Sequence, residues 1–244
     1  MTLTGHLKEL RNRIVVVLVV MLIGMILCFS YSQPLVGKLT AMGEQYGYSF
    51  IAISPQEFLL VCFSMSLLCG FLVSLPLLCY EIYAFCGPGM KAKEKTFLGL
   101  ALVFGLIFFV IGVMFAYNIT IPFMLNFLMQ FGQGTITVSP SIQQYVSFVL
   151  LVFVIFGLIF ELPVISVLLT GLGLIKPDWL IKARKIMIVL IFVLAAIITP
   201  PDIVSQIMVA LPIIVLYELS IWLSKAVYQL RKKKNKKDDE AEDD

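Results

Sequence analysis

The sequence is poor in charged residues for its length. Only 14% of its 244 residues are Asp, Glu, Lys or Arg, while 60% are hydrophobic. A soluble domain of this size carries about 25% charged residues, so the composition excludes a soluble globular protein. It indicates an all-α integral membrane protein that crosses the bilayer several times.

The residues that metal sites and hydrolases need are also scarce. There is one histidine, His6, outside the long apolar runs, and the five cysteines form no CxxC pair or other metal-ligand spacing. No HExxH, GxSxG or phosphate-binding loop occurs. We therefore expect no enzyme activity, no metal and no cofactor, which makes an intramembrane enzyme the least favoured alternative.

Long apolar runs are what the sequence has in abundance. A helix needs about 20 apolar residues to cross a hydrocarbon core of roughly 30 Å. The first run is too long for a signal peptide and no small-residue cleavage site follows it, so it is predicted to be a true span. Six transmembrane helices are predicted, the last two of them short: 14–31, 58–80, 97–117, 145–169, 186–199 and 203–224.

The basic residues predict the orientation of these spans. Six spans place both termini on one side of the membrane, and that side carries all of the 18 Lys and Arg residues except Lys38. Basic segments near helix ends are retained in the cytoplasm, so both termini are predicted to be cytoplasmic. One span more or fewer would move whole basic clusters to the outside.

Three segments between and after the spans carry further predictions. The basic block and the acidic block that follow residue 225 predict a disordered cytoplasmic tail at 226–244, behind a membrane domain at 1–225. The apolar segment 121–131 is predicted to lie on the membrane plane. Only 39 residues separate Lys185 from Lys225, so the outer turn is predicted at or just below the outer interface.

One carboxylate lies inside an apolar run, GLIFELPVISVLL at 157–169. Glu161 is separated from Lys176 by about 22 Å of helix and cannot easily reach the headgroups, while Pro163 leaves the Ile159 carbonyl without its helical partner. Two interpretations stay open. Glu161 is either a neutral acid hydrogen-bonded to a neighbouring helix, or a functional glutamate that faces a wet cavity or a partner helix, which is the favoured one.

Four segments resemble the signature segments of the twin-arginine translocase subunit TatC family, in order and with similar spacing. They are HLKELRNR near the start, FCGPGMKAKEK before the third span, FGLIFELPV in the fourth and TPPDIVSQ before the sixth. The resemblance covers residues 4–225. It implies a glove-shaped helix bundle in the bacterial cytoplasmic membrane.

The resemblance also implies a function and partners. A TatC-like protein is an export receptor that binds the twin-arginine signal peptides of folded cargo, with no nucleic-acid partner. It assembles with single-span TatA- and TatB-type proteins in a multi-copy complex, and the proton motive force drives transport. An ion-coupled secondary transporter stays as the alternative, because intramembrane carboxylates and broken helices suit it too, although the two halves of the chain show no inverted repeat.

Site residues follow from the resemblance by position. Glu9, Phe85 and Glu94 match the family's signal-peptide contacts, and Pro88 matches the loop proline that shapes the backbone there. Two separate carboxylates suit two guanidinium groups, since each accepts forked hydrogen bonds. Charge alone would make Glu94 an ordinary surface residue beside three lysines, and these lysines depart from the family pattern.

The remaining matched residues lie within the membrane and at the outer turn. Glu161 matches a fourth-span glutamate that faces the hollow of the bundle. The residues matched in the outer turn are Pro200, Pro201 and Asp202. No catalytic residue is implied.

Overall fold

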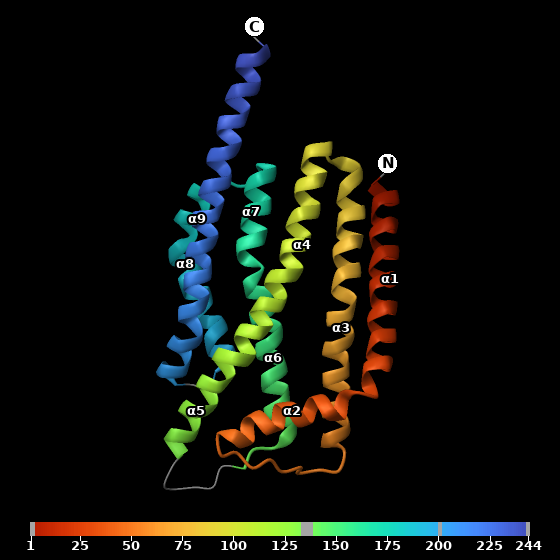
Figure 1. Ribbon diagram of the computed structural model, residues 1–244, viewed down its shortest axis with the longest axis vertical. Helices are drawn as coiled ribbons and strands as arrows, with labels where there is room; N and C mark the ends of the chain where they lie inside the picture. Colours follow the sequence, from red (N-terminus) through yellow and green to blue (C-terminus); the bar gives the residue numbers. More distant parts are fainter. Residues whose placement is uncertain (1–2, 133–138, 200–201, 243–244) are drawn as a thin grey trace. The chain divides into compact units, whose positions relative to one another are not determined.

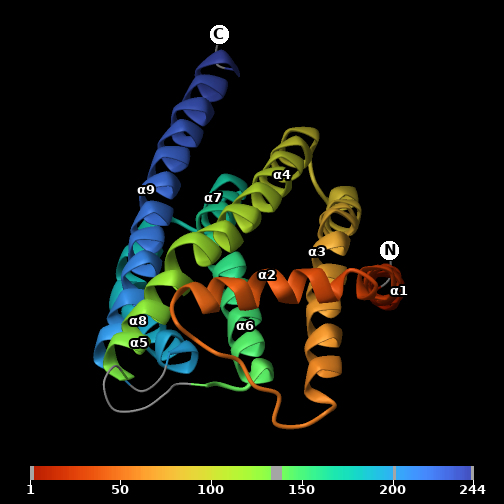
Figure 2. The ribbon, with the colours of Figure 1, turned by 60° about the horizontal axis from the view of Figure 1, so that its bottom comes forward.

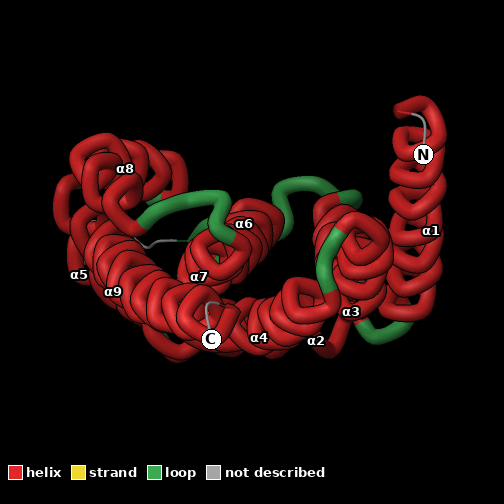
Figure 3. The backbone as a smooth tube through the Cα atoms, turned by 90° about the horizontal axis from the view of Figure 1, so that it is seen from above, coloured by secondary structure: helices red, strands yellow, loops and turns green. Residues whose placement is uncertain are grey.

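The structure is a computed structural model that describes residues 3–132, 139–199 and 202–242. Within these ranges the chain is helical apart from its loops (Figure 3), and it contains a single β-bridge, between Ile51 and Ser141. The all-α fold class is thus confirmed for the described chain. Its contacts define two compact units: a first unit of Met1–Met90 and Val113–Ile155, and a second of Lys91–Gly112 and Phe156–Asp244.

The first unit is built on two long helices, α1 (Leu3–Phe29) and α3 (Glu57–Cys86), which lie side by side (Figure 1). Glycines let their backbones meet: a Cβ atom on Gly70 would lie 2.6 Å from the Met21 carbonyl oxygen and 2.6 Å from the Met25 nitrogen. Lipid tails are as apolar as leucine, so helices in a membrane associate through such close packing. The glycine contact therefore fixes where α1 and α3 touch.

A shorter helix, α2 (Ser32–Gln45), runs across α3 and α6 (Ile142–Phe160) near one end of each in Figure 1, and it crosses in front of both in Figure 2. Its Val36, Leu39 and Met42 side chains are buried, and the Tyr145 hydroxyl donates a 2.8 Å hydrogen bond to the Leu39 carbonyl. No predicted span covers this segment, which lies between the spans 14–31 and 58–80. Helix α2 therefore covers one end of the first unit.

Segment 121–131, which is predicted to lie on the membrane plane, continues the helix that precedes it. Continuous helix runs from Ala92 to Gln130, comprising α4 (Ala92–Phe115), the π-helical turn η2 (Ala116–Thr120) and most of α5 (Ile121–Gly132). Pro122 has no N–H to donate, and a proline normally interrupts a helix. The π-helical turn just before it shifts the hydrogen-bond pattern and lets the helix continue.

A buried carboxylate organises the end of the first unit at which α2 lies. Glu57, in the first turn of α3, accepts hydrogen bonds from the Ser141 hydroxyl at 2.9 Å and the Ile53 nitrogen at 3.2 Å. Beside it, the Ile142 nitrogen donates to the Ile51 carbonyl at 3.0 Å. These bonds tie the segment before α3 to the start of α6, and no sequence pattern pointed to them.

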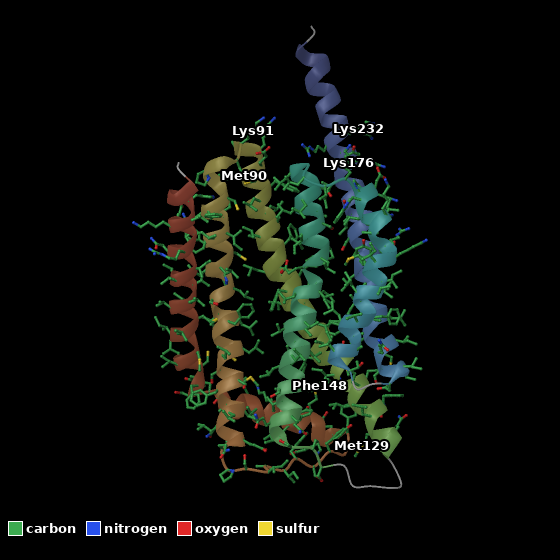
Figure 4. The ribbon with its side chains drawn as sticks, turned by 180° about the vertical axis from the view of Figure 1, so that it is seen from behind. Met90, Lys91, Met129, Phe148, Lys176 and Lys232 are labelled. Atoms are coloured by element: carbon green, nitrogen blue, oxygen red, sulfur yellow. The ribbon has the colours of Figure 1, made fainter. Side chains whose placement is uncertain are left out.

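The second unit contains part of α4 together with α7 (Leu162–Leu172), α8 (Pro177–Ile198) and α9 (Ile203–Glu242). Small polar side chains join α7 to α9: the Thr170 and Ser224 hydroxyl oxygens lie 2.6 Å apart, and the Ser166 hydroxyl donates to the Ser220 carbonyl at 3.2 Å. Lys91, Lys176 and Lys232 all lie at one end of this unit (Figure 4).

Five helices of the described chain are long and apolar enough to span a membrane: Gly5–Phe29, Glu57–Gly89, Ala92–Gln130, Ile142–Leu172 and Ile203–Lys233. The chain is therefore a multi-pass membrane protein. The remaining predicted span, 186–199, falls in α8, whose first turns contain Lys182, Arg184 and Lys185. Only the run 186–198 that follows them in α8 is free of charge, which is why this helix does not reach the length and composition of the others.

The helix α9 extends into the segment for which a disordered tail is predicted. Its helix continues to Glu242, through the basic block and into the acidic one. Lys, Arg, Glu, Gln and Ala all have high helix propensity, so a helical backbone here needs no buried face. The predicted boundary between 1–225 and 226–244 stays a prediction.

Candidate functional site

A hollow of about 650 Å³ lies at the end of the first unit where α1 begins and α3 ends. Three of the four residues predicted to form the signal-peptide site line it: Glu9, Phe85 and Pro88. Pro88 lies in the 3₁₀ turn Gly87–Gly89, which ends α3 and gives the rim its shape. Met90 follows this turn, and Met129 lies at the other end of the same unit (Figure 4).

Phe85 has an aromatic neighbour that sequence analysis did not assign. The His6 and Phe85 rings stack with centroids 4.1 Å apart and an interplanar angle of 12°. This contact joins the first turns of α1 to the last turn of α3 and holds one face of the phenyl ring. His6 is thus part of the hollow, although it has no metal-binding neighbours among the described residues.

Glu9 belongs to a network of three charged side chains. Arg13 donates to Glu9 Oε1 from Nη2 at 2.6 Å and from Nε at 3.2 Å, and its Nη1 donates to Glu81 Oε2 at 2.6 Å. The Glu9–Arg13 pair has the four-residue spacing of helical ion pairs, which the sequence displays. Glu81 lies 68 residues beyond Arg13 along the chain, and only the packing of α3 on α1 reveals the contact.

Glu94 lies in the second unit, in the first turn of α4. Its Oε2 accepts a 3.0 Å hydrogen bond from the backbone nitrogen of Lys91. The bond has the form of a capping box, in which an acidic residue in the first turn reaches back to the residue before the helix. Glu94 therefore helps α4 to begin and offers its other oxygen, Oε1, on a partly exposed side chain.

Glu161 lies at the break between α6 and α7, as the following proline predicts. Its nitrogen donates to the Leu158 carbonyl at 3.1 Å, three residues back, and α7 starts at Leu162. The side chain is half-buried against α4: a Cβ atom on Gly105 would lie 2.9 Å from Glu161 Oε2. Gly105 thus provides the space that the carboxylate occupies, a role that no sequence pattern indicated.

An apolar groove of about 330 Å³ runs along the same part of the second unit. Phe104, Phe108, Pro163 and Val164 are among the residues that line it. Glu161 is two residues from Pro163 along the chain. A polar group is thus placed close to an apolar groove within a membrane-spanning segment.

Asp202 acts as a cap in the structure. Its Oδ2 accepts a 2.6 Å hydrogen bond from the Ser205 nitrogen, and its carbonyl accepts one from Gln206 at 3.2 Å, which starts α9. Gln206 in turn donates from Nε2 to the Phe192 carbonyl of α8 at 2.9 Å. Pro200 and Pro201, the other predicted residues of this turn, lie outside the described residues.

These features define a class of protein: a multi-pass helical membrane protein whose carboxylates lie at helix starts, turns and one helix break. Comparison with known proteins identifies the family. The family model described as "Sec-independent protein translocase protein (TatC)" matches residues 5–212. The chain belongs to the TatC family.

Relatives of similar length support this assignment. The Sec-independent protein translocase protein TatC of Desulforapulum autotrophicum is 36% identical over 223 residues, covering 89% of this chain and 82% of the relative. The Aquifex aeolicus TatC is 35% identical over 238 residues, covering 96% and 98%. The Bacillus subtilis TatCy is 32% identical over 239 residues, covering 98% and 94%.

A solved structure is also similar. The crystal structure of the twin-arginine translocase receptor TatC matches with a TM-score of 0.81 and 35% identity, over 91% of this chain and 99% of that one. The chain is thus a receptor subunit of the twin-arginine protein translocase, and it is not an enzyme. Family membership favours this function over the secondary transporter that sequence analysis kept as an alternative.

Proposed function

We propose that this chain binds the twin-arginine signal peptides of folded cargo through Glu9, Phe85 and Glu94, with Pro88 shaping the rim of the site. The observation that carries the proposal is the hollow that holds Glu9, Phe85 and Pro88 together at one end of the first unit. It combines a carboxylate with aromatic and apolar walls. A signal peptide offers the complementary groups, arginines followed by apolar residues.

The geometry of Glu9 suits an incoming guanidinium. Both hydrogen bonds from Arg13 end on Oε1, and Oε2 lies 3.8 Å from His6 Nδ1, which is beyond hydrogen-bonding distance. Oε2 is then the oxygen that a cargo arginine would use. Glu94 supplies the carboxylate for the second arginine through Oε1, while Oε2 keeps its bond to the Lys91 nitrogen.

We place the site on the cytoplasmic side of a bacterial inner membrane, in a six-span, glove-shaped bundle with both termini inside. In the second unit, basic residues gather at the end where α4 begins and α7 ends (Figure 4). The uncharged run of α8 then serves as the short fifth span, with Lys182, Arg184 and Lys185 at the cytoplasmic interface.

We further propose that TatA- and TatB-type single-span proteins assemble with this chain in a multi-copy complex driven by the proton motive force. The observation that favours a helix partner is Glu161, a half-buried carboxylate near an apolar groove on the second unit. A polar group there gives a partner helix a hydrogen-bond anchor inside the bilayer.

Site-specific photocrosslinking in membranes tests the proposal. A photoreactive residue at position 9, 85 or 94 should crosslink to a twin-arginine signal peptide, and excess unlabelled peptide should abolish the product. Position 44 is an exposed residue of α2, the helix at the opposite end of the first unit; it is the matched control and should give no competed product. Equal crosslinking from position 44 and the three site positions would refute the site.

A further inference from the structure

Arg13 poses a problem for the recognition of arginine by Glu9. Its guanidinium lies 2.6 Å from the very carboxylate that a cargo arginine is proposed to bind. Two like charges on one carboxylate repel each other, and Arg13 alone would cancel the charge of Glu9. A signal peptide would then find a neutral ion pair in place of an anion.

Glu81 resolves this problem. It forms an equally short ion pair with Arg13, on Nη1 rather than on the nitrogens that contact Glu9. With Glu81 present, the three side chains together carry one net negative charge. That charge matches one cargo arginine.

The exposures of the three side chains indicate how Glu81 acts. The Glu81 side chain is 14% exposed, against 28% for Glu9 and 24% for Arg13. Glu81 also lines a narrow cleft of about 90 Å³ whose walls are mainly apolar, including Leu10, Ile14 and Leu78. It is absent from the lining of the larger hollow that holds Glu9. A cargo peptide therefore meets Glu9, while Glu81 contacts Arg13 behind it.

We propose that Glu81 is a positioning residue for signal-peptide recognition: it holds and neutralises Arg13, so that Glu9 keeps both its charge and its Oε2 atom for the cargo arginine. The inference rests on the proposed function and adds a residue that the sequence did not single out. Arg13 then competes with the cargo arginine for Glu9, and Glu81 determines how strongly it competes.

The test measures the affinity of the full-length protein in nanodiscs for a fluorescent twin-arginine signal peptide. Glu81→Gln keeps an oxygen that accepts the Arg13 hydrogen bond but removes the charge, and it should weaken binding about tenfold. Arg13→Gln together with Glu81→Gln restores the net charge, so this double variant should bind within about threefold of wild type. Arg13→Gln alone should bind at least as tightly as wild type.

Two controls separate charge from structure. Glu81→Asp keeps the charge and should also bind within about threefold of wild type. Glu44→Gln removes the same charge from an exposed position at the other end of the first unit and should leave binding unchanged.

Three results would overturn the inference. They are unchanged binding by Glu81→Gln, a double variant as weak as Glu81→Gln, and a Glu81→Asp variant as weak as Glu81→Gln. Each would mean that Glu81 only fastens α1 to α3, or has no part in recognition. If the wild-type protein does not prefer the twin-arginine peptide to a sequence-matched diglutamine peptide, the proposed function itself fails, and this inference fails with it.

Discussion

Replacing Glu94 separates a role in recognition from a role in folding, because the structure gives this residue both. Its Oε2 accepts one backbone hydrogen bond at the start of α4. Loss of a helix cap costs about 0.5–2 kcal/mol, a modest part of a stability of about 5–15 kcal/mol. Glu94→Ala should therefore still insert into the membrane and fold.

Recognition should respond more strongly than folding. A hydrogen bond to a charged group contributes about 1.5–3 kcal/mol, so Glu94→Ala should weaken twin-arginine peptide binding by about 10- to 150-fold. Glu94→Gln keeps an acceptor for the Lys91 nitrogen and should lose less. Glu94→Lys adds a positive charge beside Lys91, Lys93 and Lys95, so it should abolish export altogether.

The assays are peptide affinity in nanodiscs, export of a twin-arginine cargo in cells, and the amount of folded protein in membranes. Asp178→Lys is a matched control, since Asp178 is an acidic residue in the first turn of α8 in the same unit. It should export normally. Wild-type export by Glu94→Lys would refute the reasoning, and equal losses of affinity in Glu94→Gln and Glu94→Lys would exclude an electrostatic contact.

Three further predictions concern the membrane interior and the opposite end of the first unit. Glu161→Gln should export nearly normally while Glu161→Leu is impaired, with peptide binding kept in both; equal loss of export would indicate a proton relay. Gly70→Ala should destabilise the detergent-solubilised protein by about 1–3 kcal/mol because its Cβ meets the α1 backbone, whereas Gly37→Ala, with open space around it, should not. Glu57→Ala should lower the free energy of unfolding by about 1–3 kcal/mol, because it leaves the Ser141 hydroxyl and the Ile53 nitrogen unpaired. Thermal unfolding measures this loss, and a Glu57→Ala variant that melts like wild type would contradict it.

The sequence predicts the membrane-spanning helices of this chain well because a helix must have a minimum length of apolar residues to cross the bilayer. Four of the five apolar helices contain a predicted span. The break in the helix at Glu161 follows from Pro163. The span in α8 is harder to predict because Lys182, Arg184 and Lys185 directly precede a short apolar run in the same helix. Run length alone does not separate these two parts.

The elements that sequence missed depend on contacts between distant residues. The segment that forms α2 has no long apolar run, and its position depends on a bond from Tyr145, which is 106 residues away from Leu39. Segment 121–131 is predicted to lie on the membrane plane because it is apolar and falls in the uncharged stretch between the predicted spans 97–117 and 145–169. The π-helical turn that lets the helix pass Pro122 has no clear sequence signal.

The candidate site shows the same division. Glu9, Phe85, Pro88 and Glu94 were found through short motifs, since each lies within a recognisable local segment. Arg13, which is paired with Glu81, determines which oxygen of Glu9 is open to a ligand, and Gly105 provides the space beside Glu161. Glu81 and Gly105 come from other helices, so periodicity and spacing along one segment could not identify them.

Two carboxylates of this chain, Glu9 and Glu94, are proposed to recognise two guanidinium groups, and one titration tests this most directly. Nanodiscs containing the full-length protein are titrated with a fluorescent signal peptide carrying Arg-Arg and with the same peptide carrying Lys-Lys. A guanidinium binds a carboxylate through a planar fork that lysine lacks, so the Arg-Arg peptide should bind at least about tenfold tighter. The preference should vanish when Glu9→Gln and Glu94→Gln are combined. Equal affinity of the wild-type protein for both peptides, or an unchanged preference in the double variant, would contradict the account.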